Sequence, residues 1–559
     1  MTTSNFIPLT QIARIKSTLI ETLRFLAILL PGFLALFLVV RAFVNGHVSD
    51  ITFALWLLPI QAASLLVPNP ILETPTERRR FLLKLAGLLP PIAALFPLTV
   101  VLLIFGQLDS AAFVFHLVFG IDGTPLAGFT PYIVTVAIYW ASILITLYRL
   151  RRWIRHVPFW WSLSVAVMVL GNPVLHEIVF NEVQAKYSRL ESLMPEFQEP
   201  TLIAPTQGEN PDLIILYLEG LEGTYGIDAA FGDIYDPIER LSEQGVAFTN
   251  VGQIRGTGWS LAGMTATQCG MPLMPLGSRP LGRTADIKSI APNLTCLTDV
   301  LHARGYHSTY ASTTEIIGSD RGHYGFDNFY GSHQLNQIID LNNATTPGAI
   351  AARNSGVVDS WGLRDAEGFA IALAHVKERL QSDQPYALIL STMDTHGPKG
   401  YTSPQCQHQG LPAIDDDLTH AIKCTTALTE EFIADLQTLT ADRDTRIIVT
   451  SDHLAHQNNL TPILNQFERR NRVILLNGPE APQVIDTPAA MPDIYPTLLN
   501  WLGWLAPDVP QQAGIGTSLL QNQPTLTQRL GMDAIDDRLR LDVELSHHFW
   551  HQAPRRAQQ

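Results

Sequence analysis

Residues 255–272 read RGTGWSLAGMTATQCGMP, and the organisation of the whole chain is best approached from this stretch. Thr257 lies between Gly256 and Gly258, at the predicted start of a helix. The glycines let the backbone approach a ligand closely, and the unpaired N–H groups of a helix N-terminus favour an anion. A hydroxyl placed there suits a nucleophile that attacks an anionic centre such as a phosphate. The simpler interpretation is an N-cap threonine, because threonine commonly caps helices.

The composition argues against nucleic-acid binding and differs between two parts of the chain. The 559 residues carry a net charge of −14 and a mean hydropathy of +0.14. An acidic chain gives no support to nucleic-acid binding, which needs a basic face. Residues 1–180 are mostly apolar, whereas the remainder has the composition of a soluble protein. We therefore expect a membrane domain over 1–180, a connector over 181–211, a soluble domain over 212–525 and a tail over 526–559.

The apolar part contains five segments long enough to be membrane helices, since a span needs about 17–25 residues. They lie at 23–44, 51–67, 81–105, 132–150 and 159–180. Lys and Arg collect in cytoplasmic loops. The loop before residue 81 contains Arg78, Arg79 and Arg80, whereas the long loop 106–128 contains neither Lys nor Arg. This pattern predicts a cytoplasmic N-terminus and places everything after residue 180 outside.

The connector begins with NEVQAKYSRLESLMPEF at 181–197, which has the pattern of an amphipathic helix lying on the bilayer or of a solvated linker helix. Beyond residue 211, short apolar runs alternate with helical patterns. Strands are predicted at 213–218, 246–251, 307–311, 386–392, 446–451 and 473–477, and helices at 237–244, 293–304, 366–380, 418–439 and 493–502. This alternation predicts an α/β domain with a central, mostly parallel sheet covered on both faces.

Acidic side chains and a histidine follow two of the predicted strands. Glu219 comes after ILYL, and Asp452 and His453 come after RIIVTS. Ligands of α/β sheets bind beyond the carboxyl ends of the strands, so these groups and Thr257 are predicted to form an oxygen-rich site for a divalent cation with one nitrogen ligand. Taken singly, each group is more often a helix cap or a surface turn.

Several motifs together carry a family resemblance. They are IILYLEGLEGTY, GTGWSLAGMTATQCGMPL, WGLRD at 361–365, MDTHGP at 393–398, TSDH at 450–453 and DIYPTLLNWLG at 493–503. In this order, after an apolar N-terminal region, the chain resembles the sulfatase-like phosphoglycerol and phosphoethanolamine transferases of the alkaline phosphatase superfamily. The resemblance is closest to the phosphoglycerol transferases of periplasmic glucan synthesis, and weaker to the lipoteichoic acid synthases.

The resemblance implies roles for particular residues. Glu219, Thr257, Asp452 and His453 would bind a divalent cation, manganese first, with zinc or magnesium as alternatives. Thr257 would be the nucleophile, because coordination favours its alkoxide, and Ser260 is the alternative nucleophile.

Other residues have weaker assignments. His396 would contact the phosphoryl head group and protonate the leaving alkoxide. Arg321 is a candidate clamp for phosphate or glycerol. Trp361 and Asp365 match a motif that we expect to position a loop. Glu222 and His456 lie close to the ligands in sequence without an assigned role.

Four cysteines all follow the apolar region. An even number suggests disulfides in an oxidising compartment, and four unrelated buried thiols are an equal alternative from the count alone. In the light of the resemblance we expect a Cys406–Cys424 disulfide and, less firmly, a Cys269–Cys296 disulfide.

The resemblance also implies substrates and a location. Phosphatidylglycerol would be the donor, a periplasmic glucan or another polyol the acceptor, and the bacterial inner membrane the location, with the soluble domain in the periplasm. Three alternatives stay open: phosphoethanolamine transfer to lipid A or a glycan, hydrolysis by a metal-dependent phosphodiesterase or sulfatase, and a non-catalytic sensor. The absence of a C-x-P-x-R or S-x-P-x-R segment argues against a sulfatase, and the complete ligand set argues against a sensor.

Overall fold

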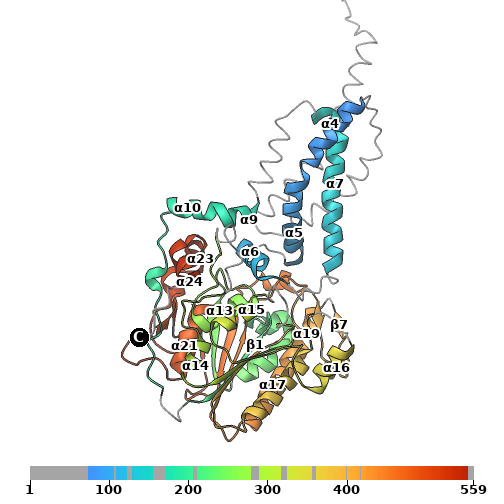
Figure 1. Cartoon of the computed structure of the whole chain (residues 1–559). Helices are drawn as coiled ribbons and strands as arrows, with labels where there is room; N and C mark the ends of the chain where they lie inside the picture. Colours follow the sequence, from blue (N-terminus) through green and yellow to red (C-terminus); the bar gives the residue numbers. More distant parts are fainter. Residues whose placement is uncertain are drawn as a thin grey trace, which may run out of the picture. The chain divides into compact units, whose positions relative to one another are not determined.

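The structure is a computed structural model of the whole chain (Figure 1). It describes residues 74–105, 109–121, 129–154, 172–205, 210–277, 289–316, 324–355, 361–397, 399–415 and 417–551. Arg321 and the predicted spans 23–44 and 51–67 lie outside these residues, as does most of 159–180.

A nine-stranded sheet forms the centre of the soluble domain. Its strand order is β10-β2-β9-β8-β1-β5-β3-β4, and β11 also pairs with β2. These strands comprise β1 Asp212–Leu218, β2 Val246–Gly252, β3 His307–Ser312, β4 Gln337–Ile339, β5 Tyr386–Ser391, β8 Thr445–Ser451, β9 Asn471–Leu476, β10 Gln483–Ile485 and β11 Ala489–Ala490. Only β9 pairs in an antiparallel sense, with β2 and β8. The prediction of an α/β domain with a mostly parallel sheet is confirmed.

Helices cover both faces of the sheet because its central strands are apolar on both sides. Every residue of β1 is buried. Ile214 and Leu216 of β1 pack in one core cluster with α12 Asp236–Ser242, α17 Asp365–Arg379 and α19 Leu418–Leu439. On the other face, the hydroxyl of Tyr217 lies 2.6 Å from that of Thr267 in α13, Ser260–Cys269. Figure 1 shows α14 Leu297–Ala303 and α21 Ile494–Trp501 on the same side as α13.

The described part of the apolar region consists of separate helices. The predicted span 81–105 is divided between α4 Pro75–Ala86 and α5 Leu89–Phe105. Prolines at 90 and 91 suit the first turn of the second helix, where a backbone N–H is not needed. The predicted span 132–150 lies within α7 Thr130–Ile154. Within the described residues, no helix combines the length and apolarity needed to cross a bilayer.

The chain divides into two compact units by its internal contacts. One contains residues 1–109 and 126–176, and the other contains 110–125 and 177–559. The helix α6 Ser110–Phe119, which comes from the loop predicted between two spans, therefore belongs to the unit of the sheet. The tail also belongs there: its helices are α22 Leu526–Leu530, α23 Met532–Leu541 and α24 Val543–Trp550.

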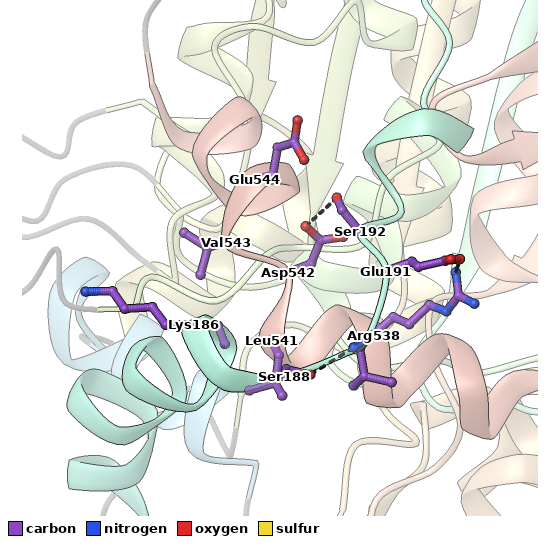
Figure 2. Close-up of a pocket in the computed structure, with 11 residues that line it drawn as sticks. Lys186, Ser188, Glu191, Ser192, Arg538, Leu541, Asp542, Val543 and Glu544 are labelled. Atoms are coloured by element: carbon purple, nitrogen blue, oxygen red, sulfur yellow. Dashed lines mark hydrogen bonds and ion pairs between the residues drawn. The ribbon is translucent and has the colours of Figure 1, made fainter.

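The connector is less helical than predicted. α10 covers only Asn181–Tyr187, and the chain then runs extended apart from a short turn at Met194–Glu196. Asp542 accepts hydrogen bonds from the Leu193 N–H at 2.6 Å and the Ser192 hydroxyl at 2.9 Å, which anchors this stretch to the tail (Figure 2). A shallow pocket of about 290 Å³ lies here, lined in part by Lys186 and Arg538, and no predicted site residue lines it.

Candidate active site

Three neighbouring parallel strands bring the predicted ligands together. β1 lies between β8 and β5, with Leu218 in register with Ser451 and Tyr217 in register with Ser391. The residues that follow these strands therefore leave the sheet at the same edge. Glu219 follows β1, Asp452 and His453 follow β8, and the loop with His396 follows β5.

The donor atoms of Glu219, Asp452 and His453 lie within 4.8 Å of one another. His453 Nε2 lies 3.2 Å from Glu219 Oε1 and 3.5 Å from Asp452 Oδ2. All three side chains are at most 3% exposed. Two buried carboxylates and an imidazole at this separation are the donor set of a hard or borderline divalent cation such as manganese, zinc or magnesium.

Hydrogen bonds with the backbone hold Asp452 and His453 in place and use only one of the two possible ligand atoms of each side chain. Asp452 Oδ1 accepts the N–H groups of Gly220 and His453, both at 2.9 Å. His453 Nδ1 lies 2.8 Å from the carbonyl oxygen of Leu454, so the ring proton is assigned to Nδ1. His453 Nε2 is buried and has no hydrogen-bond partner within the described part of the chain. With Nδ1 held by the Leu454 carbonyl oxygen, Nε2 is the nitrogen that can bind a metal ion once its own proton has left.

Burial and the charges of the neighbouring groups shift the pKa values of all three side chains in the cluster. Burial disfavours the Glu219 carboxylate, but the charges of His453 and His396 outweigh burial and hold the pKa of Glu219 below its usual range. Burial and the charge of Glu219 raise the pKa of Asp452. Burial disfavours the His453 imidazolium, yet Asp452 and Glu219 raise the pKa of His453 overall. Paired carboxylates of this kind need a positive charge between them, which a proton or a cation can supply.

Thr257 is fully buried beside this cluster. Its hydroxyl donates to the carbonyl oxygen of Ile254 at 2.7 Å, an interaction that holds it in a tight turn. Gly256 has a φ of +79°, so this position requires glycine. A Cβ on Gly263 would lie 1.7 Å from the Asp452 carbonyl oxygen and 3.4 Å from that of Thr257, which shows how closely α13 packs against the ligand loop.

Ser260 has a more direct contact with the cluster than expected. Its hydroxyl donates to Glu219 Oε2 at 2.9 Å, whereas the hydroxyl of Thr257 is engaged with Ile254. Both hydroxyls thus stay candidates for the nucleophile on geometry alone. Ser260 in this arrangement orients the carboxylate of Glu219.

His396 lies at the edge of the site. Its Nε2 lies 4.0 Å from Glu219 Oε1, and its Nδ1 lies 2.8 Å from the carbonyl oxygen of Gly397. Its ring packs against Trp361 in a tilted arrangement, with the centroids 4.1 Å apart and the ring planes at 47°. The ring centroid of His456 lies 4.6 Å from that of His453 and 6.2 Å from that of His396. Burial and the neighbouring His453 lower the pKa of His456, which therefore lines the site as a neutral group.

A buried acid pair positions the loop of His396. Asp365 accepts the N–H groups of Met393 and Asp394, and Asp394 accepts the N–H of Asp365 at 3.0 Å and a hydrogen bond from Arg364 at 3.1 Å. Burial and the charge of Asp365 raise the pKa of Asp394 to about 8. The expectation that the WGLRD motif positions a loop has its physical basis in these bonds. Arg364 and Asp394 were not singled out from the sequence, although both lie inside quoted motifs.

Glu222 acts as a clamp on the ligand loop. It is fully buried, its two carboxylate oxygens share the Nε–H of Arg469 at 3.0 Å each, and one of them accepts the N–H of Ala455 at 3.2 Å. Arg469 in turn donates to the carbonyl oxygen of Ala455 at 2.7 Å. Sequence reasoning missed Arg469, because nothing in ERRNR shows which arginine turns inward.

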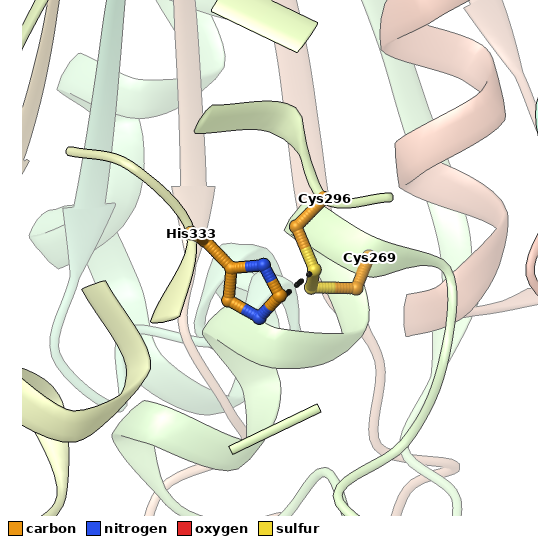
Figure 3. A group of neighbouring side chains, drawn as sticks. All are labelled: Cys269, Cys296 and His333. Carbon is orange, nitrogen blue, oxygen red and sulfur yellow. Dashed lines mark hydrogen bonds between the residues drawn. A yellow bond between two sulfur atoms is a disulfide. The ribbon is translucent and has the colours of Figure 1, made fainter. Parts of the chain in front are cut away.

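A second cluster of possible metal ligands is already satisfied. Cys269 and Cys296 are joined in a disulfide, and His333 Nε2 lies 3.6 Å from Cys296 Sγ (Figure 3). His333 Nδ1 lies 2.7 Å from Asp299 Oδ2. The Cys406–Cys424 disulfide is also present, so all four cysteines are paired as expected.

Comparison with known proteins places this geometry in a family. Residues 213–504, about half of the chain, match the model of the Sulfatase family, and the chain therefore belongs to that family.

Its curated relatives include the phosphoglycerol transferase I of Xanthomonas campestris pv. campestris strain B100, with 29% identity over 428 residues. That match covers 74% of this chain and 58% of the relative, so the chain spans less than two thirds of the relative's length.

Similar solved structures include an alkaline phosphatase superfamily protein from Vibrio parahaemolyticus, with 21% identity and a TM-score of 0.44 over 62% of this chain and 79% of that one. The lipoteichoic acid synthase LtaP from Listeria monocytogenes has 16% identity and a TM-score of 0.43 over 61% and 81%.

Proposed function

We propose that the protein is a metal-dependent phosphoglycerol transferase. It moves phosphoglycerol from phosphatidylglycerol to a periplasmic glucan or another extracytoplasmic polyol, and releases diacylglycerol. The observation that carries this proposal is the convergence of Glu219, Asp452 and His453 within 4.8 Å at the end of two adjacent strands, beside the buried turn of Thr257. The names of the curated relatives support phosphoglycerol as the transferred group.

In this proposal Glu219, Asp452 and His453 would hold a divalent cation, with the Thr257 oxygen as a further ligand. The bound cation would lower the pKa of that hydroxyl and neutralise charge on the phosphoryl oxygens. Thr257 gives up its hydrogen bond to Ile254, its hydroxyl proton would pass to solvent when the cation binds, and the resulting oxygen attacks phosphorus and returns to the same state at the end of the cycle. Ser260 keeps Glu219 in place through its 2.9 Å hydrogen bond.

His396 supplies the proton that the leaving diacylglycerol oxygen needs. Its Nδ1 is occupied by the Gly397 carbonyl oxygen, so Nε2 is the nitrogen that faces the reacting groups. The ring of Trp361 packs against that of His396 and helps to hold it in place. The P–O bond to diacylglycerol breaks as the bond to Thr257 forms, which leaves a phosphoglyceryl-threonine. A hydroxyl of the acceptor then attacks the same phosphorus, His396 takes its proton, and the threonine is regenerated.

The location is part of the proposal. We infer a multi-pass protein of the bacterial inner membrane with its catalytic domain in the periplasm, supported by the five apolar segments, the distribution of Arg and Lys, and two disulfides in the catalytic domain. A single cysteine introduced at exposed Gln409 would test this orientation. An impermeant maleimide should block this cysteine in whole cells if the catalytic domain lies in the periplasm.

A labelling experiment tests the function. The protein is incubated with phosphatidylglycerol labelled in the glycerol head group, and the labelled peptide is identified by mass spectrometry. The proposal predicts label on Thr257, diacylglycerol as product, no label in Thr257→Ala, and retained label in the matched variant Ser260→Ala. Label on Ser260, or unchanged label in Thr257→Ala, would contradict the assigned nucleophile. Phosphatidylethanolamine labelled in its head group is the parallel arm, and its preferential use would favour the alternative donor.

A further inference from the structure

The helix α6, Ser110–Phe119, lies directly beside the nucleophile loop. Its buried residues Val114, Phe115 and Phe119 face the soluble domain. The ring centroid of Trp259 lies 6.1 Å from that of Phe115 and 6.0 Å from that of His116. Phe119 stacks on Trp550 of the tail at 6.2 Å. A Cβ added at Gly325, just before α15 Phe326–Ser332, would lie 2.9 Å from the Cζ of Phe115, so this ring also packs against the start of α15.

The opposite side of α6 is also apolar. Its sequence SAAFVFHLVF contains no Asp, Glu, Lys or Arg. Leu117 is 66% exposed, and Phe113 is only half-buried. A helix that is apolar on all sides is normally enclosed by protein or lipid, because water would otherwise contact its outer face. The chain reaches α6 from α5 and leaves it toward α7, which are both largely apolar helices.

Trp259 connects this helix to the chemistry. It lies two residues after Thr257 and immediately before α13, and it is 8% exposed. Its indole N–H is buried and has no acceptor among the residues that the structure describes. A buried tryptophan N–H normally has an acceptor, so a ligand oxygen at this position would satisfy it.

We propose that α6 and Trp259 form the subsite for the acylglycerol part of the donor lipid, an inference that rests on the proposed function and deepens it. The outer face of α6 binds the acyl chains through Phe113 and Leu117, and the Trp259 N–H donates to an ester carbonyl oxygen. In a glycerophospholipid these carbonyls lie only a few bonds from the phosphorus, so a donor adjacent to the nucleophile is suitably placed to reach one. Binding of this remote part of the substrate would help to place the phosphorus against Thr257.

Chain-length dependence tests the apolar face. The full-length protein in detergent micelles is assayed for kcat/KM with dioleoyl- and dihexanoyl-phosphatidylglycerol. Leu117→Asp is expected to lower kcat/KM for the dioleoyl lipid about tenfold, since binding energy from several buried methylene groups is lost, and to change it less than twofold for the dihexanoyl lipid. The matched control is Val484→Asp, which places the same charge at a 67% exposed apolar position in β10.

The N–H of Trp259 is tested separately. Trp259→Phe keeps a ring and removes the donor, so kcat/KM should fall about fivefold for both lipids, as expected for one hydrogen bond, and stay unchanged for bis(p-nitrophenyl) phosphate, which lacks esters of fatty acids. Equal effects of Leu117→Asp and Val484→Asp, or equal loss on the soluble diester, would overturn the subsite while leaving the function in place. A parent protein that turns over neither lipid would overturn the proposed function itself, and the subsite with it.

Discussion

Two clusters of metal-ligating side chains lie near the two ends of the same helix, and only one of them is suited to bind a cation. At the start of α13, Ser260 contacts Glu219 of the carboxylate cluster, whereas Cys269 at its end belongs to the Cys269–Cys296–His333 group. Both groups are buried. In the carboxylate cluster the carboxylate oxygens and the imidazole nitrogen are held together only by ion pairs that a cation can replace, whereas in the cysteine group the sulfurs are bonded to each other. Closely spaced ligand residues can therefore bind a cation only if their donor atoms are not already covalently bonded to each other.

The largest expected effect comes from removing one charge of the carboxylate cluster. Asp452→Asn should lower the transfer rate about 10³-fold, because loss of the cation removes several kcal/mol of transition-state stabilisation and each 1.4 kcal/mol is tenfold in rate. Chelation of the parent protein should have a similar effect, reversed by added manganese. His333→Gln in the cysteine group is the matched change and should leave the rate within about threefold, since it touches no ligand of the proposed ion. A variant Asp452→Asn with a tenth or more of the parent rate would remove the distinction between the clusters.

The cysteine group should instead contribute to stability. Cys269→Ala combined with Cys296→Ala opens a loop of 27 residues, which the chain-entropy model values at about 3.5 kcal/mol of unfolding free energy. Urea unfolding followed by circular dichroism measures this loss. The Cys406–Cys424 pair, with a separation of 18 residues, provides a second disulfide for comparison and should contribute about 3 kcal/mol. Loss of bound manganese in the Cys269/Cys296 variant under conditions where it is folded would contradict a purely structural role.

The clamp on the ligand loop should affect metal affinity moderately. Arg469→Met removes the partner of the fully buried Glu222, and the distortion of the Asp452 loop should weaken manganese binding about 10- to 100-fold, as for other groups that orient metal ligands. Isothermal titration calorimetry measures this change. Arg240→Met breaks an exposed ion pair with Glu430 and is the matched control, with no expected change in affinity. Adding Glu222→Gln to Arg469→Met should recover part of the affinity, because the uncompensated buried charge is then removed.

The smallest effect at neutral pH concerns His375, a buried histidine that has no carboxylate partner among the residues that the structure describes. Burial lowers the pKa of His375 from 6.5 to about 4, so the unfolded chain binds more protons than the folded one between these pH values. The free energy of unfolding should therefore rise with pH through this window, and it should fall by up to about 3 kcal/mol as the pH is lowered from 6.5 to 4. His375→Gln should flatten this part of the stability profile, whereas His408→Gln, at an exposed position, should not. An unchanged slope in His375→Gln would show that other groups cause the acid sensitivity.

The sheet and the ligand set were predictable because they depend on local patterns. Apolar runs such as ILYL and RIIV specify buried parallel strands, and the rule that sites lie beyond their carboxyl ends places Glu219 beside Asp452. The six predicted strands are all present and differ from the observed ones only at their ends, for example 213–218 against Asp212–Leu218. The short strands β4, β10 and β11 were not predicted.

Features that depend on distant contacts were not predictable in the same way. The helix expected over 181–197 ends at Tyr187, and the stretch that follows is bound by Asp542, which lies far along the chain. The membership of α6 in the soluble domain depends on Phe115 meeting Trp259, and the role of Glu222 depends on Arg469. These pairs are separated by more than a hundred residues, so no local pattern reports them.

Counting the bound metal decides whether Glu219, Asp452 and His453 form a cation site. The purified protein is dialysed against manganese, freed of excess ion and analysed by inductively coupled plasma mass spectrometry. The account predicts one manganese per chain in the parent and in His333→Gln, and none in Glu219→Gln or Asp452→Asn, with all four proteins equally folded by circular dichroism. One ion per chain retained in both Glu219→Gln and Asp452→Asn, or lost in His333→Gln, would contradict it.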